Sequence, residues 1–189
     1  RLSRVAHFIG DAQHITPQTE MDMQRNNPNL FKQQALVNGV WTDASDGKTV
    51  QVFNPFDDSL VGSAPSLNAV DIRQAIAAAQ KALPAWRGMI ARDRAFILRK
   101  LHALILENRD DLAVILTTEQ GKPLAESRAE ISTGAEYFLW YAEEARRRYG
   151  QVIPSTAIGN QPLTFSQGIG VAALITPWNF PFSMLARKL

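Results

Sequence analysis

The chain has 189 residues, of which 46% are hydrophobic and 20% are charged, and its formal net charge is +2. These proportions are those of an ordinary globular protein, and the scatter of Lys and Arg among carboxylates argues against a nucleic-acid-binding surface. Cysteine is absent, which excludes disulfides, cysteine-rich metal sites and a cysteine nucleophile within these residues. No apolar run reaches the ~18 residues that a membrane-spanning helix needs.

Residues 1–29 are set apart from the rest of the chain. The stretch begins without Met and with basic residues, as a mitochondrial transit peptide does, but its three acidic residues argue against one. We expect a disordered tail or an upstream extension here, with a start near Met21 or Met23.

Two β-hairpins are predicted next. Asn38-Gly39 lies between two short β-prone runs over residues 35–41, and Asn-Gly is the strongest short hairpin signal. Residues 49–53 alternate apolar and polar side chains as a half-buried strand does, and residues 60–64 are their expected antiparallel return.

Helices then dominate. Asn68 is the expected cap of a helix that Pro84 ends, and a second helix starts near Ala91. A third covers residues 112–119 and stops at Gly121, with a proline two residues later. Residues 124–149 then predict one long helix or two.

After these helices the sequence pattern changes from helical to β-prone. Residues 151–154 and 163–167 predict two strands joined by a long loop. The apolar run over residues 171–176 predicts a strand covered on both faces, as in a parallel sheet. Two glycines precede this strand instead of following it, so they do not form the dinucleotide-binding fingerprint.

A polar side chain follows the last predicted strand. The run Thr-Pro-Trp-Asn-Phe-Pro occupies residues 176–181, and ligands of open α/β sheets bind at the carboxyl ends of strands. Two prolines restrict the backbone around Asn179, so its amide could serve as a fixed donor to a developing oxyanion. The alternative is that Asn179 only caps the following helix. Spacing alone leaves both interpretations open.

The final helix carries a second candidate feature. Phe180, Met184 and Arg187 are spaced to share one helix face. An aromatic ring, a thioether and a guanidinium would form an apolar channel with a cationic end, suited to an aldehyde that carries a carboxylate. The alternative is core packing plus one solvated Arg.

Three segments resemble the aldehyde dehydrogenase superfamily: residues 176–181, residues 119–123 (Glu-Gln-Gly-Lys-Pro) and Asn54-Pro55. The resemblance runs from about Leu30 to the end of the chain. Further segments narrow it to the succinate-semialdehyde dehydrogenases, with glutarate-semialdehyde dehydrogenases nearly as close: residues 29–35, 82–87 and 118–126.

The resemblance implies an α/β fold, of which this chain would be the N-terminal portion. Residues 30–149 would form the mostly helical start of a cofactor-binding domain, and residues 150–168 a bridging pair of β-strands that joins subunits. Residues 169–189 would supply the first strand of a Rossmann-like sheet, the Asn179 loop and the start of the next helix.

The resemblance also implies a reaction. In the superfamily a cysteine thiolate attacks the aldehyde, hydride passes to NAD or NADP, and a Glu-activated water releases the acid. Asn179 would hold the oxyanion. The residues expected beside the nicotinamide are Ile175, Thr176, Pro177, Trp178 and Asn179. The residues expected around the substrate are Phe180, Met184 and Arg187, with Arg187 facing the distal carboxylate.

Partners and location follow from the same resemblance. The substrate would be a small aldehyde acid, the parent enzyme a cytoplasmic homodimer or homotetramer, and nucleic acid and membrane no part of its function. Phe138, Trp140 and Tyr141 are expected near the subunit interface.

The chain departs from the family pattern in ways that bear on activity. The nucleophilic Cys and the general-base Glu lie far downstream in the family, so we expect an inactive N-terminal fragment. Gly168 replaces a usual proline, and Phe182 replaces a small residue and could alter packing around the tunnel. Two rivals remain open, namely a dehydrogenase for glutarate semialdehyde or another aldehyde and a short non-catalytic interaction module.

Overall fold

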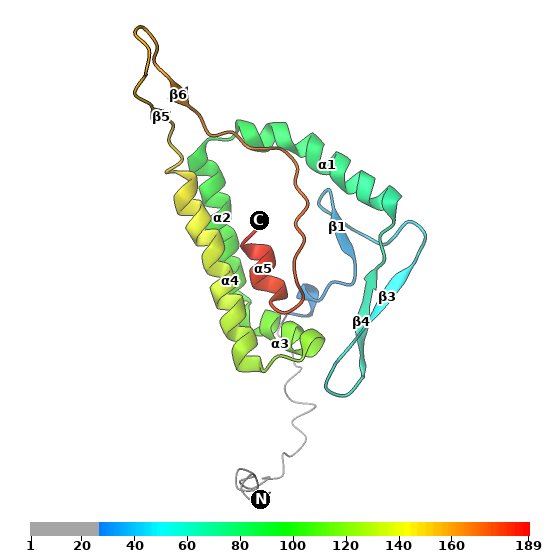
Figure 1. Ribbon diagram of the computed structural model, residues 1–189. Coiled ribbons are helices and arrows are strands. Elements are labelled where there is room, and N and C mark those ends of the chain that lie inside the picture. The colour runs from blue at the N-terminus through cyan, green and yellow to red at the C-terminus, as the bar shows by residue number, and fades with distance from the viewer. Residues whose placement is uncertain (1–26) are drawn as a thin grey trace, which may run out of the picture.

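The computed structural model describes residues 27–189 (Figure 1). Most of the stretch expected to be a tail lies outside the described residues. The last residues of that stretch are described. Among them, η1 (Pro28–Leu30) is a 3₁₀ turn, and the Asn27 N–H donates to the Asp111 carboxylate at 2.8 Å. The folded part therefore begins before the predicted boundary at residue 30.

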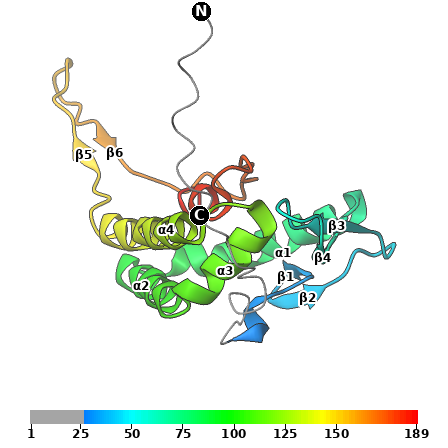
Figure 2. The same ribbon diagram turned by 90° about the horizontal axis from the view of Figure 1, so that it is seen from below.

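Three pairs of short antiparallel strands and five α-helices make up the described chain. In order, the remaining elements are β1 (Ala35–Val37), β2 (Val40–Thr42), β3 (Thr49–Phe53), β4 (Leu60–Pro65), α1 (Ala69–Gly88), α2 (Ala91–Glu107), α3 (Arg109–Gln120), α4 (Leu124–Ala145), β5 (Gln151–Val152), β6 (Leu163–Thr164) and α5 (Pro181–Ala186). Helices α2, α3 and α5 all pack against α4, and the β5–β6 arm projects away from them (Figure 2).

Both predicted hairpins are confirmed. Asn38 and Gly39 have φ of 51° and 78°, and positive φ at both positions is what the two-residue turn of a right-twisted hairpin requires. Strands β1 and β2 pair in the register Val37 to Val40. Strands β3 and β4 are antiparallel as expected, with a register shift between Val52 and Phe53.

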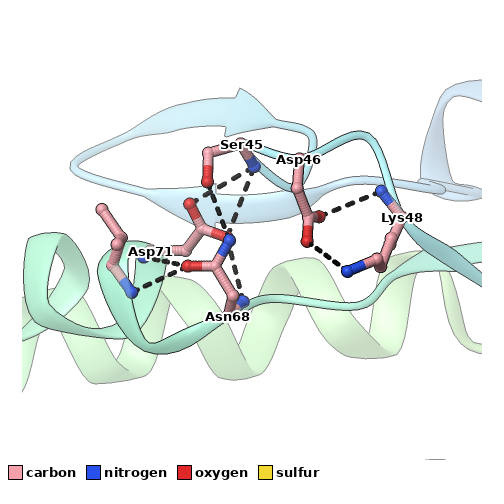
Figure 3. Close-up of polar contacts among 6 residues, drawn as sticks. Ser45, Asp46, Lys48, Asn68 and Asp71 are labelled. Carbon is pink, nitrogen blue, oxygen red and sulfur yellow. Dashed lines mark hydrogen bonds and ion pairs between the residues drawn. The ribbon is translucent and has the colours of Figure 1, made fainter.

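A polar cluster fixes the start of α1 against the loop after β2 (Figure 3). The Asn68 side chain accepts from the Asp71 N–H at 3.3 Å, and the Asp71 carboxylate accepts from the Asn68 N–H at 3.0 Å, which completes a capping box. Asp71 also accepts from the Ser45 N–H. These hydrogen bonds, chiefly that from Asn68, lower the pKa of the Asp71 carboxyl. Asp46 pairs with Lys48 at 3.0 Å, which likewise lowers its pKa.

The helix boundaries differ from prediction in three places. Helix α1 continues through Pro84 and ends at Gly88. A proline removes one main-chain donor, and because only the last turn follows Pro84, this loss does not end the helix. Helix α3 begins at Arg109, three residues before its expected start. Residues 124–149 hold one helix, α4, which ends at Ala145. Gly121 terminates α3 in the left-handed conformation with φ of 79°, as predicted.

The core lies on the face of α4 that α2, α3 and α5 cover. Its buried members are Ile105, Ala113, Leu116, Ile131, Ala135, Phe138 and Ala186. Phe138 is only 4% exposed, and its ring packs in the core of its own chain, so its expected place near a subunit interface stays a prediction. Trp140, on the opposite face, is 62% exposed.

The segment before α5 does not form the predicted strand. Residues 171–176 make no ladder hydrogen bonds with any described strand, and Ile175 is 85% exposed. A strand exists only through its neighbours' N–H and C=O groups, and every described sheet is an isolated antiparallel pair. The two strands predicted over residues 151–154 and 163–167 are present as β5 and β6, but each is only two residues long. Over residues 27–189 no helix is both long and apolar enough to span a membrane.

Candidate active-site segment

The Asn179 loop leads directly into α5. Phe180 is the N-cap residue of α5 and Pro181 its first residue, and no side chain caps this helix. The alternative role of Asn179 as a helix cap is therefore wrong. The Asn179 side chain is exposed, and within the described residues its amide has no hydrogen-bond partner.

A lysine from the α3–α4 connection holds the backbone of this loop. The Lys122 Nζ donates to the carbonyl oxygen of Asn179 at 3.0 Å and lies 3.9 Å from the centre of the Phe180 ring. It also forms an ion pair with Glu130 on α4. A segment 57 residues further along the chain is thus attached to the end of α3.

Glu130 holds the first turn of α5. Its Oε1 accepts from the N–H groups of Phe182 and Ser183 at 3.0 and 3.2 Å, while its Oε2 takes the Lys122 ammonium. Sequence reasoning interpreted residues 119–123 as a helix terminus and as part of the family resemblance, and it assigned no role to Lys122 or Glu130. A signal was present, because Glu130 lies on the buried face of α4 with Ser127 and Gly134, where a carboxylate needs a partner.

The predicted substrate residues are brought together only in part. The Arg187 guanidinium donates to the Met184 sulfur at 3.3 Å, as residues on one helix face can. Phe180 instead faces Lys122. Arg187 borders an open groove of about 580 Å³ that Tyr137 and Trp140 of α4 also line.

Residues 175–178, the segment predicted to lie beside the nicotinamide and called the nicotinamide wall below, are open to solvent. Ile175 is 85% and Trp178 is 79% exposed, so apolar and aromatic surface is available to a flat ring. Lys188 donates to the Ile175 carbonyl and attaches this wall to the end of α5. Among residues 27–189 no three His, Asp or Glu side chains gather as metal ligands would.

Comparison with known proteins decides the family. The profile of the aldehyde dehydrogenase family matches residues 41–189. The chain belongs to this family. The expected α/β fold, an N-terminal portion of the aldehyde dehydrogenase fold, is confirmed with it.

Two curated aldehyde dehydrogenases illustrate the likeness. A succinate-semialdehyde dehydrogenase [NADP(+)] of Escherichia coli is 49% identical over 166 residues, covering 88% of this chain and 34% of the relative. A glutarate-semialdehyde dehydrogenase of Pseudomonas putida is 48% identical, covering 88% of this chain and 35% of the relative. The likeness to both groups of semialdehyde dehydrogenases, nearly equal in degree, is therefore confirmed.

A solved structure gives the same family. The crystal structure of succinate-semialdehyde dehydrogenase from Burkholderia pseudomallei superposes with a TM-score of 0.84 at 43% identity, over 87% of this chain and 34% of that one. The chain spans about a third of the length of the relatives it matches. A protein that joins this segment to the remaining two thirds is called the full-length enzyme below.

Phe182, one of the departures from the family pattern, packs against a glycine. A Cβ added to Gly134 on α4 would lie 2.4 Å from two atoms of the Phe182 ring. Gly134 is buried and lies one helical turn beyond Glu130. The missing side chain at position 134 therefore makes room for the ring at position 182, and α5 docks closely on α4.

Replacing Gly134 by Ala should lower the free energy of unfolding of the full-length enzyme by about 1–3 kcal/mol, because overpacking forces the ring and α5 to move. Gly88→Ala is the matched control, since a Cβ there meets nothing within 4 Å. Urea unfolding measures both. In a Phe182→Ala background, Gly134→Ala should no longer lower the free energy of unfolding. An unchanged loss in that background would contradict the contact.

Proposed function

We propose that this segment supplies the Asn179 side of the active site of an NAD- or NADP-dependent dehydrogenase that oxidises succinate semialdehyde to succinate. The observation that carries the proposal is the exposed Asn179 amide on a loop whose backbone is fixed by Lys122. The two curated relatives support the substrate class, since both are named for semialdehydes that end in a carboxylate.

Asn179 acts on the oxygen of the aldehyde. Attack by a thiolate turns the carbonyl oxygen into an oxyanion, and a preorganised amide donor stabilises that charge more than it stabilises the starting aldehyde. Because the backbone on both sides of Asn179 is held, little entropy remains to be lost when the amide binds the oxyanion. The thiolate must come from outside these 189 residues, which contain no cysteine. We therefore expect no dehydrogenase activity from the chain by itself.

The exposed wall over residues 175–178 would receive the nicotinamide. When bound, NAD or NADP would accept the hydride from the substrate carbon. Ile175, Pro177 and Trp178 offer apolar surface for one face of a flat ring. The NADP(+) in the name of the Escherichia coli relative supports this class of cofactor.

Arg187 would bind the distal carboxylate. It stands at the edge of the groove beside α4, where its guanidinium is exposed. Its backbone is positioned by the Tyr141 hydroxyl, which donates to the Arg187 carbonyl at 2.8 Å. An anionic tail bound there would orient the aldehyde toward Asn179, at the other end of the short helix.

Glutarate semialdehyde is the second candidate substrate. The 48% identity to the Pseudomonas putida enzyme favours it almost as strongly as succinate semialdehyde is favoured. Comparison of kcat/KM for the two semialdehydes in the full-length enzyme decides between them. A candidate from another class is a non-catalytic interaction module, and a coding sequence without a downstream Cys and Glu in the expected contexts would favour it.

Assembly would involve the β5–β6 arm. We expect a cytoplasmic homodimer or homotetramer in which the arm joins subunits. The projection of the arm away from the helices (Figure 1) and the exposed ring of Phe165 support this arrangement. Light scattering of the full-length enzyme with and without Phe165→Ser tests it.

Replacing Arg187 by Leu in the full-length enzyme should lower kcat/KM for succinate semialdehyde by roughly tenfold to over a hundredfold, since a charged hydrogen bond contributes about 1.5–3 kcal/mol. An uncharged aldehyde of similar length should lose little, because it has no carboxylate to bind. Steady-state kinetics with both substrates measure the difference. Arg146→Leu, at the solvated end of α4, is the matched control. Equal losses with the two aldehydes would refute the role of Arg187.

A further inference from the structure

The Lys122 ammonium is buried between two segments that meet at the Asn179 loop. Its side chain is only 8% exposed, and an ammonium has three N–H donors to satisfy. It pairs with Glu130, donates to the Asn179 carbonyl at 3.0 Å, and lies 3.9 Å from the centre of the Phe180 ring, within cation–π range. Two of these three partners belong to the Asn179 loop.

The Glu130 carboxylate is more deeply buried and completes the arrangement. Its side chain is 1% exposed, and both oxygens are occupied. One takes the Lys122 ammonium, and the other accepts from the N–H groups of Phe182 and Ser183. Hydrogen bonds to an ionised acceptor are stronger and more directional than neutral ones. The pair thus binds the backbone just before and just after residues 180–181.

We propose that Lys122 and Glu130 are positioning residues for Asn179. Lys122 binds the main-chain oxygen of Asn179 and leaves the side-chain amide for the substrate, and Glu130 fixes the helix that starts immediately afterwards. Neither residue touches the reacting atoms. Their effect passes through the direction in which the Asn179 amide points. The inference rests on the proposed role of Asn179 in binding the oxyanion.

The effect on the reaction follows from geometry. A displacement of about 1 Å in a catalytic group can cost about a hundredfold in rate. Without the ammonium, the carbonyl of Asn179 loses its anchor, while Arg187 and the groove beside α4 stay in place. The loss should therefore appear in kcat, with KM for the semialdehyde little changed.

The first test compares single variants of the full-length enzyme. Lys122→Met should lower kcat by about tenfold to a hundredfold. Glu130→Gln, which keeps an oxygen for the α5 N–H groups but loses the charge, should lower kcat by a smaller factor. The matched controls are Lys81→Met, on exposed α1, and Glu126→Gln, one helical turn before Glu130 and exposed. Both controls should keep the kcat of the unmodified enzyme.

The second test separates positioning from folding. Breaking a buried pair leaves one charge without a partner, so each single variant should unfold at a lower temperature, and the double variant should recover part of that loss. If Lys122 only supported the fold, kcat would recover with the unfolding temperature in the double variant. We expect kcat to stay low in the double variant, because the Asn179 carbonyl still lacks its anchor. Recovery of kcat would overturn the inference.

The third test asks whether Lys122 acts through Asn179. In an Asn179→Ala background, Lys122→Met should lower kcat by less than about threefold, because the group that it positions is gone. An undiminished loss in that background would overturn the inference. If Asn179→Ala by itself left kcat unchanged, the proposed oxyanion role would fail first. Should Lys122→Met not fold, Glu130→Gln enters the same comparison in its place.

Discussion

Replacing Asn179 by Ala in the full-length enzyme should lower kcat by about 10²–10³-fold while KM for the semialdehyde changes little. The amide donates to an oxyanion that exists only after the nucleophile has attacked, so its loss raises the energy of the transition state and not that of the bound aldehyde. Steady-state kinetics separate the two constants, and single-turnover measurements show whether hydride transfer is the step that slows.

The matched control for this change is Asn160→Ala, an exposed asparagine in the loop of the β5–β6 arm. It should keep the full kcat. Asn179→Asp should be at least as damaging as Asn179→Ala, because a carboxylate repels the developing negative charge. A kcat within a few-fold of the unmodified value in Asn179→Ala would exclude the amide from the oxyanion site.

Expressed without further residues, the chain should aggregate or remain partly molten. Its core is small for its length: six of the ten buried hydrophobic side chains among the described residues are alanines. Large apolar side chains remain exposed on the segment before α5 and on the arm, including Ile169, Ile175 and Phe165. Exposed apolar side chains of this size favour association over a single packed state.

Three measurements test this expectation. Size-exclusion chromatography with light scattering should show species heavier than a monomer, a dye that reports exposed apolar surface should bind, and calorimetry should lack a sharp transition. A chimera in which residues 30–189 replace the corresponding third of the Escherichia coli relative should behave oppositely on all three. A soluble, cooperatively unfolding monomer of the chain alone would contradict the prediction.

Local chemistry explains which elements the sequence predicts well. The hairpin at Asn38-Gly39, the cap at Asn68 and the stop at Gly121 each depend on residues within a few positions of one another, and all three are present. Pro84 was misjudged because a proline this close to the end of a helix costs one hydrogen bond, and the other helical hydrogen bonds still favour continuation to Gly88.

Non-local contacts explain the features that the sequence did not predict. Residues 171–176 have the apolar pattern of a central strand, but a strand needs neighbours, and no described strand lies beside them. The Lys122–Glu130 pair escaped notice because its role depends on Asn179, which lies 57 residues after Lys122 in the chain. The sequence predicted Asn179 and Arg187 as candidates from their spacing, while the groups that hold their backbones emerge only when α4 and α5 meet.

The contact between Gly134 and Phe182 has a consequence for how such a chain can change over generations. The ring at position 182 fits only where position 134 carries no Cβ, whereas a small side chain at position 182 would tolerate either residue there. Position 134 is therefore restricted for as long as position 182 carries the ring. Any descendant that keeps the ring loses stability when position 134 acquires a side chain.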